Sequence, residues 1–222
     1  MSTENKMKLY SYIVAHDFGL APNPFWGELT LSICKPKIRL SALEGDWIIG
    51  TGSKNVDSKD GGVINYSGKL VYAMKITGTK TMEEYDAYCN DHLKPKIPFI
   101  NKKDWRRIVG DSIYDFSIGK TPRLRKVLHK EEDKPIDLSG KNTLLSKHFY
   151  YFGSEARIIP PEFTDFIKKE QGHKVIADTE IIKRFEKWLK SEFELNKLYG
   201  NPQLRWKIDK SLSGECEVNC DN

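Results

Sequence analysis

The stretch Gly45-Asp-Trp-Ile-Ile-Gly-Thr-Gly-Ser-Lys54 decides how this chain is expected to fold. A Gly-Asp turn leads into the apolar residues around Trp47, which predict a buried strand. The strand leaves through a second pair of glycines, where a ligand or another strand can approach the backbone closely. Ser53 and Lys54 then place a hydroxyl and a cation at its end. Because the spacing fits neither a Walker loop nor the GxGxxG fingerprint, these residues leave a strand end and a binding site equally open.

Further strands and one helix are predicted on both sides of this stretch. Apolar or alternating residues indicate strands at Leu9–Ala15, Glu28–Cys34, Lys69–Ile76 and Thr143–Phe152. A helix is expected from about Met82 to His92, because Thr81 and Glu84 match a capping box. Thr51–Gly68 is expected to be a long loop, and short strand-like pieces are expected at Arg107–Val109 and Ile113–Tyr114.

The C-terminal part changes to a helical pattern. Pro160-Pro161 precedes a helix expected from about Glu162 to Gln171, and Asp178 can cap an amphipathic helix that runs to about Tyr199. The order of elements predicts an α+β protein with a partly closed, mostly antiparallel β-barrel or sheet, one inserted helix and C-terminal helices. We expect an α+β domain at residues 1–160, a helical extension packed on it at 161–210, and a disordered tail at 211–222.

The composition of the 222 residues is that of an ordinary soluble globular protein, with 30% charged and 39% hydrophobic residues. No apolar run approaches the roughly 20 residues that a membrane span requires, and the N-terminus lacks a secretory signal, so the cytoplasm is the expected compartment. Four cysteines form no disulfide framework and five histidines form no ligand pair, so no metal and no cofactor is expected. The net charge of +5 is compatible with a nucleic-acid or nucleotide partner.

The loop Asp17–Gly27 combines glycines and prolines with three aromatic residues. Asn23 stands between two prolines, beside Phe25 and Trp26. A rigid amide next to aromatic rings suits recognition of a flat heterocycle by stacking and edge hydrogen bonds. The alternative is a loop packed as a lid over the end of the barrel.

The segment Cys34-Lys-Pro-Lys-Ile-Arg39 is basic. Its cations Lys35, Lys37 and Arg39 are candidates for phosphate binding, although a solvated turn has the same composition. Cys34 can act as a nucleophile only with a nearby base. The only upstream candidate is His16, and no local motif supports that pair. Gly110-Asp111 opens a further turn, in which Asp111 either caps the turn or hydrogen-bonds a base or sugar.

Several of these segments together resemble the nucleotide-modification-associated domain family, second type. The resemblance lies in SYIVAHDFGLAPNPFWG, CKPKIRLSALEGDWIIGTGSK, LVYAMKITGTKTMEEY, GDSIY and FYYFG, in this order, within Tyr10–Phe163. It implies a phage or bacterial system that makes modified DNA bases, and it supplies a context rather than a reaction. A weaker, fold-level similarity is to PUA-like domains, which bind a modified base in an aromatic-lined pocket.

Two functions follow as hypotheses, with the oligomeric state left open. The preferred one is binding of a modified nucleobase or nucleotide, most readily in DNA, by the residues Asn23, Phe25, Trp26, Trp47, Ser53, Lys54 and Tyr72. The alternative is an enzyme of base or nucleotide modification with the acid–base candidates Asp17, His16, Lys54, Asp111 and Asp46. A third interpretation, protein interaction alone, rests on the C-terminal amphipathic helix.

Overall fold

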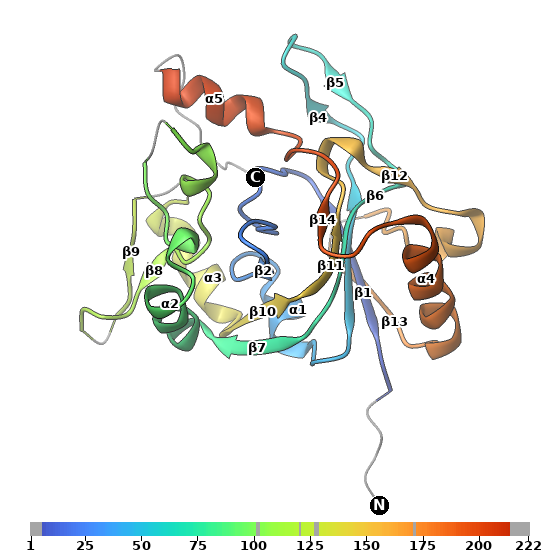
Figure 1. Ribbon diagram of the computed structural model, residues 1–222, viewed down its shortest axis with the longest axis horizontal. Helices are drawn as coiled ribbons and strands as arrows, with labels where there is room; N and C mark the ends of the chain where they lie inside the picture. The colour runs from blue at the N-terminus through green and yellow to red at the C-terminus, as the bar shows by residue number, and fades with distance from the viewer. Residues whose placement is uncertain (1–5, 101–102, 120, 127–128, 171, 214–222) are drawn as a thin grey trace, which may run out of the picture.

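The computed structural model describes residues 6–100, 103–119, 121–126, 129–170 and 172–213 (Figure 1). Its strands are β1 (Leu9–Val14), β2 (Leu29–Leu31), β3 (Trp47–Gly52), β4 (Val56–Asp57), β5 (Val63–Ile64), β6 (Lys69–Lys75), β7 (Gly78–Thr81), β8 (Tyr114–Asp115), β9 (Arg123–Leu124), β10 (Asn142–Ser146), β11 (His148–Tyr151), β12 (Arg157–Ile158), β13 (His173–Ile176) and β14 (Lys197–Leu198). Its α-helices are α1 (Pro36–Ser41), α2 (Met82–Asp91), α3 (Lys134–Ser139), α4 (Thr179–Glu192) and α5 (Arg205–Ser213). Short 3-10 helices lie at Lys94–Lys96, Trp105–Arg107, Glu131–Asp133, Gly153–Glu155 and Pro161–Phe166.

Two sheets form the centre of the molecule. The larger has the strand order β13-β1-β3-β6-β11-β14, with β12 also paired to β6, and the smaller has the order β2-β10-β7. The pairs β1–β3 and β11–β14 are parallel, whereas the other pairs in both sheets are antiparallel. The expected α+β fold with a mostly antiparallel sheet is confirmed.

A bent ribbon of two strands joins the sheets. Strand β6 continues into β7 and β10 into β11, so each of these chain segments passes from one sheet to the other. The amide of Thr77 donates to the carbonyl of Leu145 at 2.9 Å and keeps the two segments paired at the bend. The sheets therefore curl around one apolar core, which holds side chains of β1, β2, β3, β6, β10, β11 and α1. This is the partly closed arrangement expected from the sequence.

The outer face of the larger sheet is covered by α4 (Figure 1). Asp178 caps this helix by accepting from the amides of Glu180 and Ile181. The apolar side of α4 packs on β3, where Trp47 meets Phe185 edge to face at 6.3 Å between ring centroids. The apolar side of α4 is thus buried against the rest of the same chain. In the described ranges, no helix has both the length and the apolar character needed to cross a membrane.

The glycines at the end of β3 make room for other parts of the same chain. A Cβ on Gly50 would lie 2.4 Å from the Tyr72 ring, and one on Gly52 would lie 2.4 Å from Cβ and from the carbonyl oxygen of Tyr66. Real Cβ atoms do not approach so closely, so both positions need glycine for packing. Of the two explanations left open by the sequence, close approach of a neighbouring strand therefore accounts for these glycines.

Several predicted boundaries differ from the structure. Thr143–Phe152 is two strands, because Lys147 turns the chain from the smaller sheet into the larger one. Thr51–Gly68 contains the hairpin β4–β5, and Trp105–Arg107 is a 3-10 helix in the region where a short strand was expected to begin. The expected helix after Pro161 is a 3-10 helix only.

The C-terminal part contributes strands as well as helices. Strand β13 pairs with β1, and β14 pairs with β11. The helix predicted to reach Tyr199 ends at Glu192, and α5 follows it. The domain boundary after residue 160 stays a prediction. Of the expected tail, 211–213 belong to α5, whereas 214–222, with Cys216 and Cys220, lie outside the described residues.

Candidate active site

A cavity of about 330 Å³ lies where the end of β1 meets the β2–α1 turn and the segment that leads into α3. Its volume is at the lower end of the roughly 300–1,000 Å³ typical of small-molecule sites. Five of the described lining residues are aromatic or basic. The full lining is Tyr12, Ile13, Val14, Ala15, His16, Phe18, Leu20, Ala21, Cys34, Lys35, His129, Asp133, Ile136 and Asp137.

Cys34 occupies a strained turn between a strand and a helix. Cys34 has φ 54° and Lys35 has φ 43°, and both angles lie in the left-handed region that non-glycine residues rarely adopt. Such residues cost of order 1–3 kcal/mol each and persist only where the surroundings hold them. Here the Cys34 amide donates to Oδ1 of Asp137 at 2.9 Å, and its carbonyl accepts from Nε of Arg39 at 2.8 Å. A strand–turn–helix element of this kind presents a nucleophile at the surface of a pocket.

Cys34, His129 and Asp137 all line this cavity. Nδ1 of His129 lies 2.9 Å from Oδ2 of Asp137, and the neighbouring thiol of Cys34 favours the charged form of His129. Tyr114 donates a further hydrogen bond to Oδ2 of Asp137 at 3.0 Å. The chain thus contains the signature of an activated nucleophile, in which a nucleophile meets a base that a third group orients.

The electrostatics of the three groups favour a charged imidazole. Burial opposes the charge, but the hydrogen bond to Asp137 and the interactions with Cys34 outweigh it and raise the pKa of His129 to about 10. Burial likewise opposes the charge of Asp137, yet its hydrogen bonds with His129, the Cys34 amide and Tyr114 hold its pKa below the ordinary value. An imidazolium beside a thiol stabilises the thiolate, which is the nucleophilic form of cysteine.

Arg39 supports this arrangement from behind. It was predicted to bind phosphate, but its side chain is fully buried and donates to the carbonyls of Cys34, Asn142 and Asp137. The predicted phosphate role does not match this geometry, because the buried guanidinium directs its donors at these backbone carbonyls and at the sulfur of Met82. A Cβ on Gly140 would lie 2.3 Å from the guanidinium, so Gly140 leaves the space that Arg39 fills.

Of the predicted acid–base residues, the structure brings His16 to the cavity, where it is exposed. Asp17 follows it but points inward. Tyr151 donates to both its carboxylate oxygens, at 2.7 and 2.8 Å, and the Gly19 amide donates to one of them at 3.1 Å. Burial raises the pKa of Asp17 to about 6 against these hydrogen bonds. Asp17 is 1% exposed and therefore shapes the loop beside the cavity without opening into it.

Asn23 and Asp111 belong to a buried polar network elsewhere. Nδ2 of Asn23 donates to the Val109 carbonyl at 2.6 Å, and its Oδ1 accepts from Nζ of Lys96 at 2.7 Å. Asp111 accepts from the hydroxyls of Thr30, Ser32 and Tyr85. Both side chains are at most 1% exposed. The expectation that Asn23 reads a ligand edge does not match this geometry, since its amide is already used to anchor the loop.

The other residues predicted around Gly45–Lys54 also lie outside the cavity. Trp47 is fully buried under α4 and has no exposed ring face for stacking. Tyr72 is fully buried and donates to the hydroxyl of Tyr12 at 2.9 Å, so it supports a lining residue from behind. Asp46 accepts from the amides of Lys8 and Leu43 and is a turn residue. Ser53 and Lys54 follow the end of β3 that pairs with the cavity-lining end of β1, but neither is among the residues that line the cavity.

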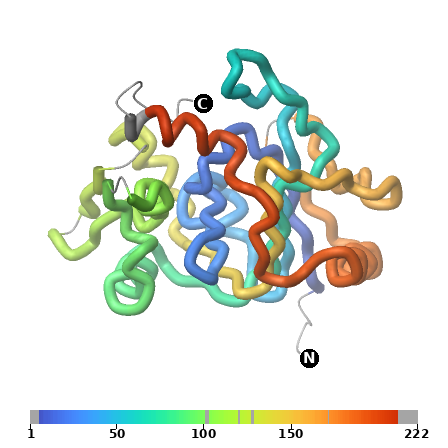
Figure 2. The backbone as a smooth tube through the Cα atoms, turned by 45° about the horizontal axis from the view of Figure 1, so that its top comes forward, coloured from blue at the N-terminus to red at the C-terminus, as the bar shows by residue number. Residues whose placement is uncertain are grey.

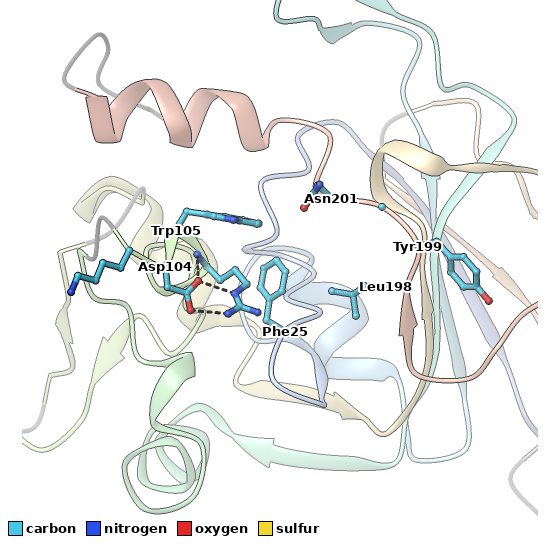
Figure 3. Close-up of a pocket in the computed structure, with 9 residues that line it drawn as sticks. Phe25, Asp104, Trp105, Leu198, Tyr199 and Asn201 are labelled. Atoms are coloured by element: carbon cyan, nitrogen blue, oxygen red, sulfur yellow. Dashed lines mark hydrogen bonds and ion pairs between the residues drawn. The ribbon is translucent and has the colours of Figure 1, made fainter.

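Phe25 of the loop lines a separate, more open pocket of about 610 Å³ (Figure 3). There Phe25 meets Trp105 edge to face at 5.3 Å between centroids, and Trp26 packs on Phe25. Asp104 and Arg106 form an ion pair at 2.8 Å (Figure 3). Figure 2 shows the C-terminal segment passing beside this loop, and the Leu204 amide donates to the Asp17 carbonyl at 2.8 Å. Among the residues that the structure describes, neither a cysteine nor a histidine lines this pocket.

Sequence reasoning missed two of the three central residues. His129 was one histidine among five without a partner, and Asp137 carried no signal of its own. The available signal was the order strand, cysteine, helix around Cys34, which is typical of a nucleophile turn. Pairing that cysteine with a histidine far along the chain required the tertiary structure.

Comparison with known proteins identifies one family. The model for nucleotide modification associated domain 2 matches residues 6–210, which is nearly the whole chain. No curated protein and no solved structure matches the sequence.

Proposed function

The chain belongs to the nucleotide modification associated domain 2 family, and from this membership and the Cys34 site we propose that it is an enzyme that modifies a nucleobase or nucleotide through a covalent bond to Cys34. The observation that carries the proposal is that Cys34 lines one cavity with His129, which Asp137 orients at 2.9 Å. Family membership supplies the class of substrate, and the side chains supply the type of catalysis.

Each of the three side chains has a role in the proposed reaction. The Cys34 thiolate attacks an electrophilic carbon of the substrate, so that a carbon–sulfur bond forms and the bond from this carbon to a leaving group breaks. The leaving group takes the electron pair of that bond and the proton of the His129 imidazolium. In the second step the neutral His129 imidazole removes a proton from water, the water oxygen bonds to the carbon, and the carbon–sulfur bond breaks with its electron pair returning to sulfur as the thiolate. Asp137 holds the imidazole in place throughout and favours its charged form.

The cavity walls fit a flat ring beside the thiol. Tyr12 and Phe18 line the cavity together with apolar side chains, and His16 stands at its edge. We propose that a base occupies this space, and that the base is part of DNA or of a nucleotide destined for it. The preferred hypothesis from the sequence, a module that only binds, needs no such triad. A PUA-like character of the fold stays a prediction.

Turnover by a Cys34 variant separates the two hypotheses. Wild type and Cys34→Ser are incubated with deoxynucleotides and with oligonucleotides that carry ordinary and modified bases, and the products are followed by mass spectrometry. We expect wild-type turnover, a covalent adduct on the peptide that contains Cys34, and loss of both in Cys34→Ser with ligand binding retained. Equal turnover by Cys34→Ser would overturn the proposal, and binding without any turnover by wild type would favour the binding module.

A further inference from the structure

A second cavity adjoins the active-site cavity and shares one wall with it. This second cavity has a volume of about 480 Å³ and is lined by Lys35, Pro36, Lys37, Ile38, Gly172 and His173. Lys35 lines both cavities. The pairing of β1 with β13 places His173 opposite Tyr12, a residue that lines the active-site cavity. A molecule that reaches Cys34 can therefore extend past Lys35 into the second cavity.

Positive charge gathers around this second cavity. In the described part of the chain, no acidic residue lines it. Burial, together with the charges of Lys37, Lys168 and Lys35, lowers the pKa of His173. Among the described residues, these three lysines form no ion pair with a carboxylate. Lys35 makes a cation–π contact with Tyr12 at 4.8 Å, and its electrostatic partner is the Cys34 thiol rather than a carboxylate.

The protein thus keeps cations of like charge close together beside its nucleophile. The repulsion between these cations is unfavourable in the free protein, and an anion bound among them offsets that repulsion. Lysine binds phosphate as a point charge, and a neutral imidazole can donate one hydrogen bond to a phosphate oxygen. We propose that the second cavity binds a phosphate group of the substrate, through Lys35, Lys37 and His173, while the base lies at Cys34.

This inference rests on the proposed function in one respect, that the substrate reaches Cys34. It narrows the substrate to a phosphorylated one, and it excludes a free base or an unphosphorylated nucleoside as the preferred ligand. It also revises the predicted phosphate site, since Lys35 and Lys37 keep that role and His173 replaces Arg39. A free nucleotide and a nucleic-acid backbone supply the same chemistry.

The experiment measures affinity in a protein that cannot turn over. Cys34→Ser is titrated calorimetrically with a deoxynucleoside, the matching 5′-monophosphate, a short single-stranded oligonucleotide and inorganic phosphate. The titrations are repeated with Lys37→Ala and Lys37→Glu added to that background. Lys187→Ala, an exposed lysine on α4, is the control for a general change in charge.

We expect the monophosphate to bind at least tenfold more tightly than the nucleoside. Lys37→Ala should remove most of that advantage and Lys37→Glu all of it, whereas nucleoside affinity and the Lys187→Ala control should not change. If only the oligonucleotide shows the advantage and the Lys37 dependence, the phosphate belongs to a nucleic-acid backbone. If the monophosphate binds more tightly than the nucleoside and this advantage depends on Lys37, the substrate is a free nucleotide.

Equal affinity for nucleoside and phosphorylated ligands, or an advantage that survives Lys37→Glu, would overturn the phosphate site. These results are independent of the proposed reaction, because Cys34→Ser has no nucleophilic thiol. A phosphate advantage together with full turnover by Cys34→Ser would refute the covalent mechanism and leave the phosphate site standing. Alkylation of Cys34 in the Lys37 variants, mapped by peptide mass spectrometry, reports whether the active site keeps its arrangement.

Discussion

At the scale of single residues, two cysteines of the described part of the chain occupy opposite environments. Cys34 is half-buried and lines the cavity together with His129, whereas Cys89 is fully buried in α2. Burial raises the pKa of Cys89 to about 12. Thiol reactivity depends on thiolate content and access, so the two side chains should differ strongly.

Iodoacetamide should therefore alkylate Cys34 and leave Cys89 unmodified in the folded protein. Replacement of His129 by Gln should slow the alkylation of Cys34 by at least tenfold and lower turnover by about 10²- to 10⁴-fold, the usual contribution of a positioned acid–base group. Peptide mass spectrometry over time distinguishes the two cysteines from those of the tail. Equal rates for Cys34 in wild type and His129→Gln would contradict the role given to the imidazole.

The raised pKa of His129 also predicts how stability depends on pH. The folded pKa is about 10, and the unfolded value is about 6.5. The folded protein thus keeps a proton that the unfolded chain releases, so this stabilisation is fully present below pH 6.5 and is lost as the pH rises through about 10. In urea unfolding at pH 6 and pH 10, the stability difference between wild type and His129→Gln should shrink toward the higher pH. A difference that stays constant would contradict the assignment.

At the scale of elements, the β2–α1 turn depends on one buried arginine. Arg39 lies in α1, and its side chain donates hydrogen bonds to the carbonyls of Cys34, Asp137 and Asn142. The planar guanidinium of Arg39 therefore links the turn at Cys34 to the end of α3 and to the start of β10. Lysine carries the same charge but cannot reproduce this fork.

Arg39→Lys should reduce the rate of turnover by a larger factor than it reduces the free energy of unfolding. The lost hydrogen bonds release the left-handed turn at Cys34, and the buried carbonyls lose their donors at a cost of roughly 1–3 kcal/mol each where unsatisfied. Turnover and the urea midpoint are measured together, with Leu40→Ala on the exposed side of α1 as the control. If Arg39→Lys keeps full turnover, the arginine has no positioning role.

At the scale of the whole molecule, α4 and the larger sheet form one packed unit. Phe185 is fully buried and packs on Trp47, Phe163 and Phe166. Strand β13 arrives from the same C-terminal part and pairs with β1, which carries the lining residue Tyr12. The helix is therefore needed to cover the sheet that supports the active site, and an interaction surface is not required to explain its apolar side.

Phe185→Ala should reduce the free energy of unfolding by about 3–5 kcal/mol, the usual cost of a large cavity in a core. Lys187→Ala on the exposed side of the same helix should change it by less than about 0.5 kcal/mol. Urea unfolding of both variants checks this. A small effect of Phe185→Ala on the free energy of unfolding, accompanied by a change in oligomeric state, would instead favour a role of this helix in protein interaction.

The sequence by itself determined the local features of this protein. The apolar run after Asp46, the capping box at Thr81 and the amphipathic spacing after Asp178 each depend on side chains a few residues apart, so their physical causes can be read from neighbours. Of the residues predicted around a site, His16 and Lys35 line the active-site cavity. The family and the α+β class also followed from the sequence.

Only the tertiary structure decided what lies beside Cys34. Its partner Asp137 is 103 positions away in the chain, and they meet because the curled sheet and α1 place the two loops at one end of β1. In the same packing Gly50 lies against Tyr72 and Gly52 against Tyr66. The spacing of these glycines in the sequence fitted a ligand site equally well. Local patterns do not encode such contacts, since these depend on which distant segments the core brings together.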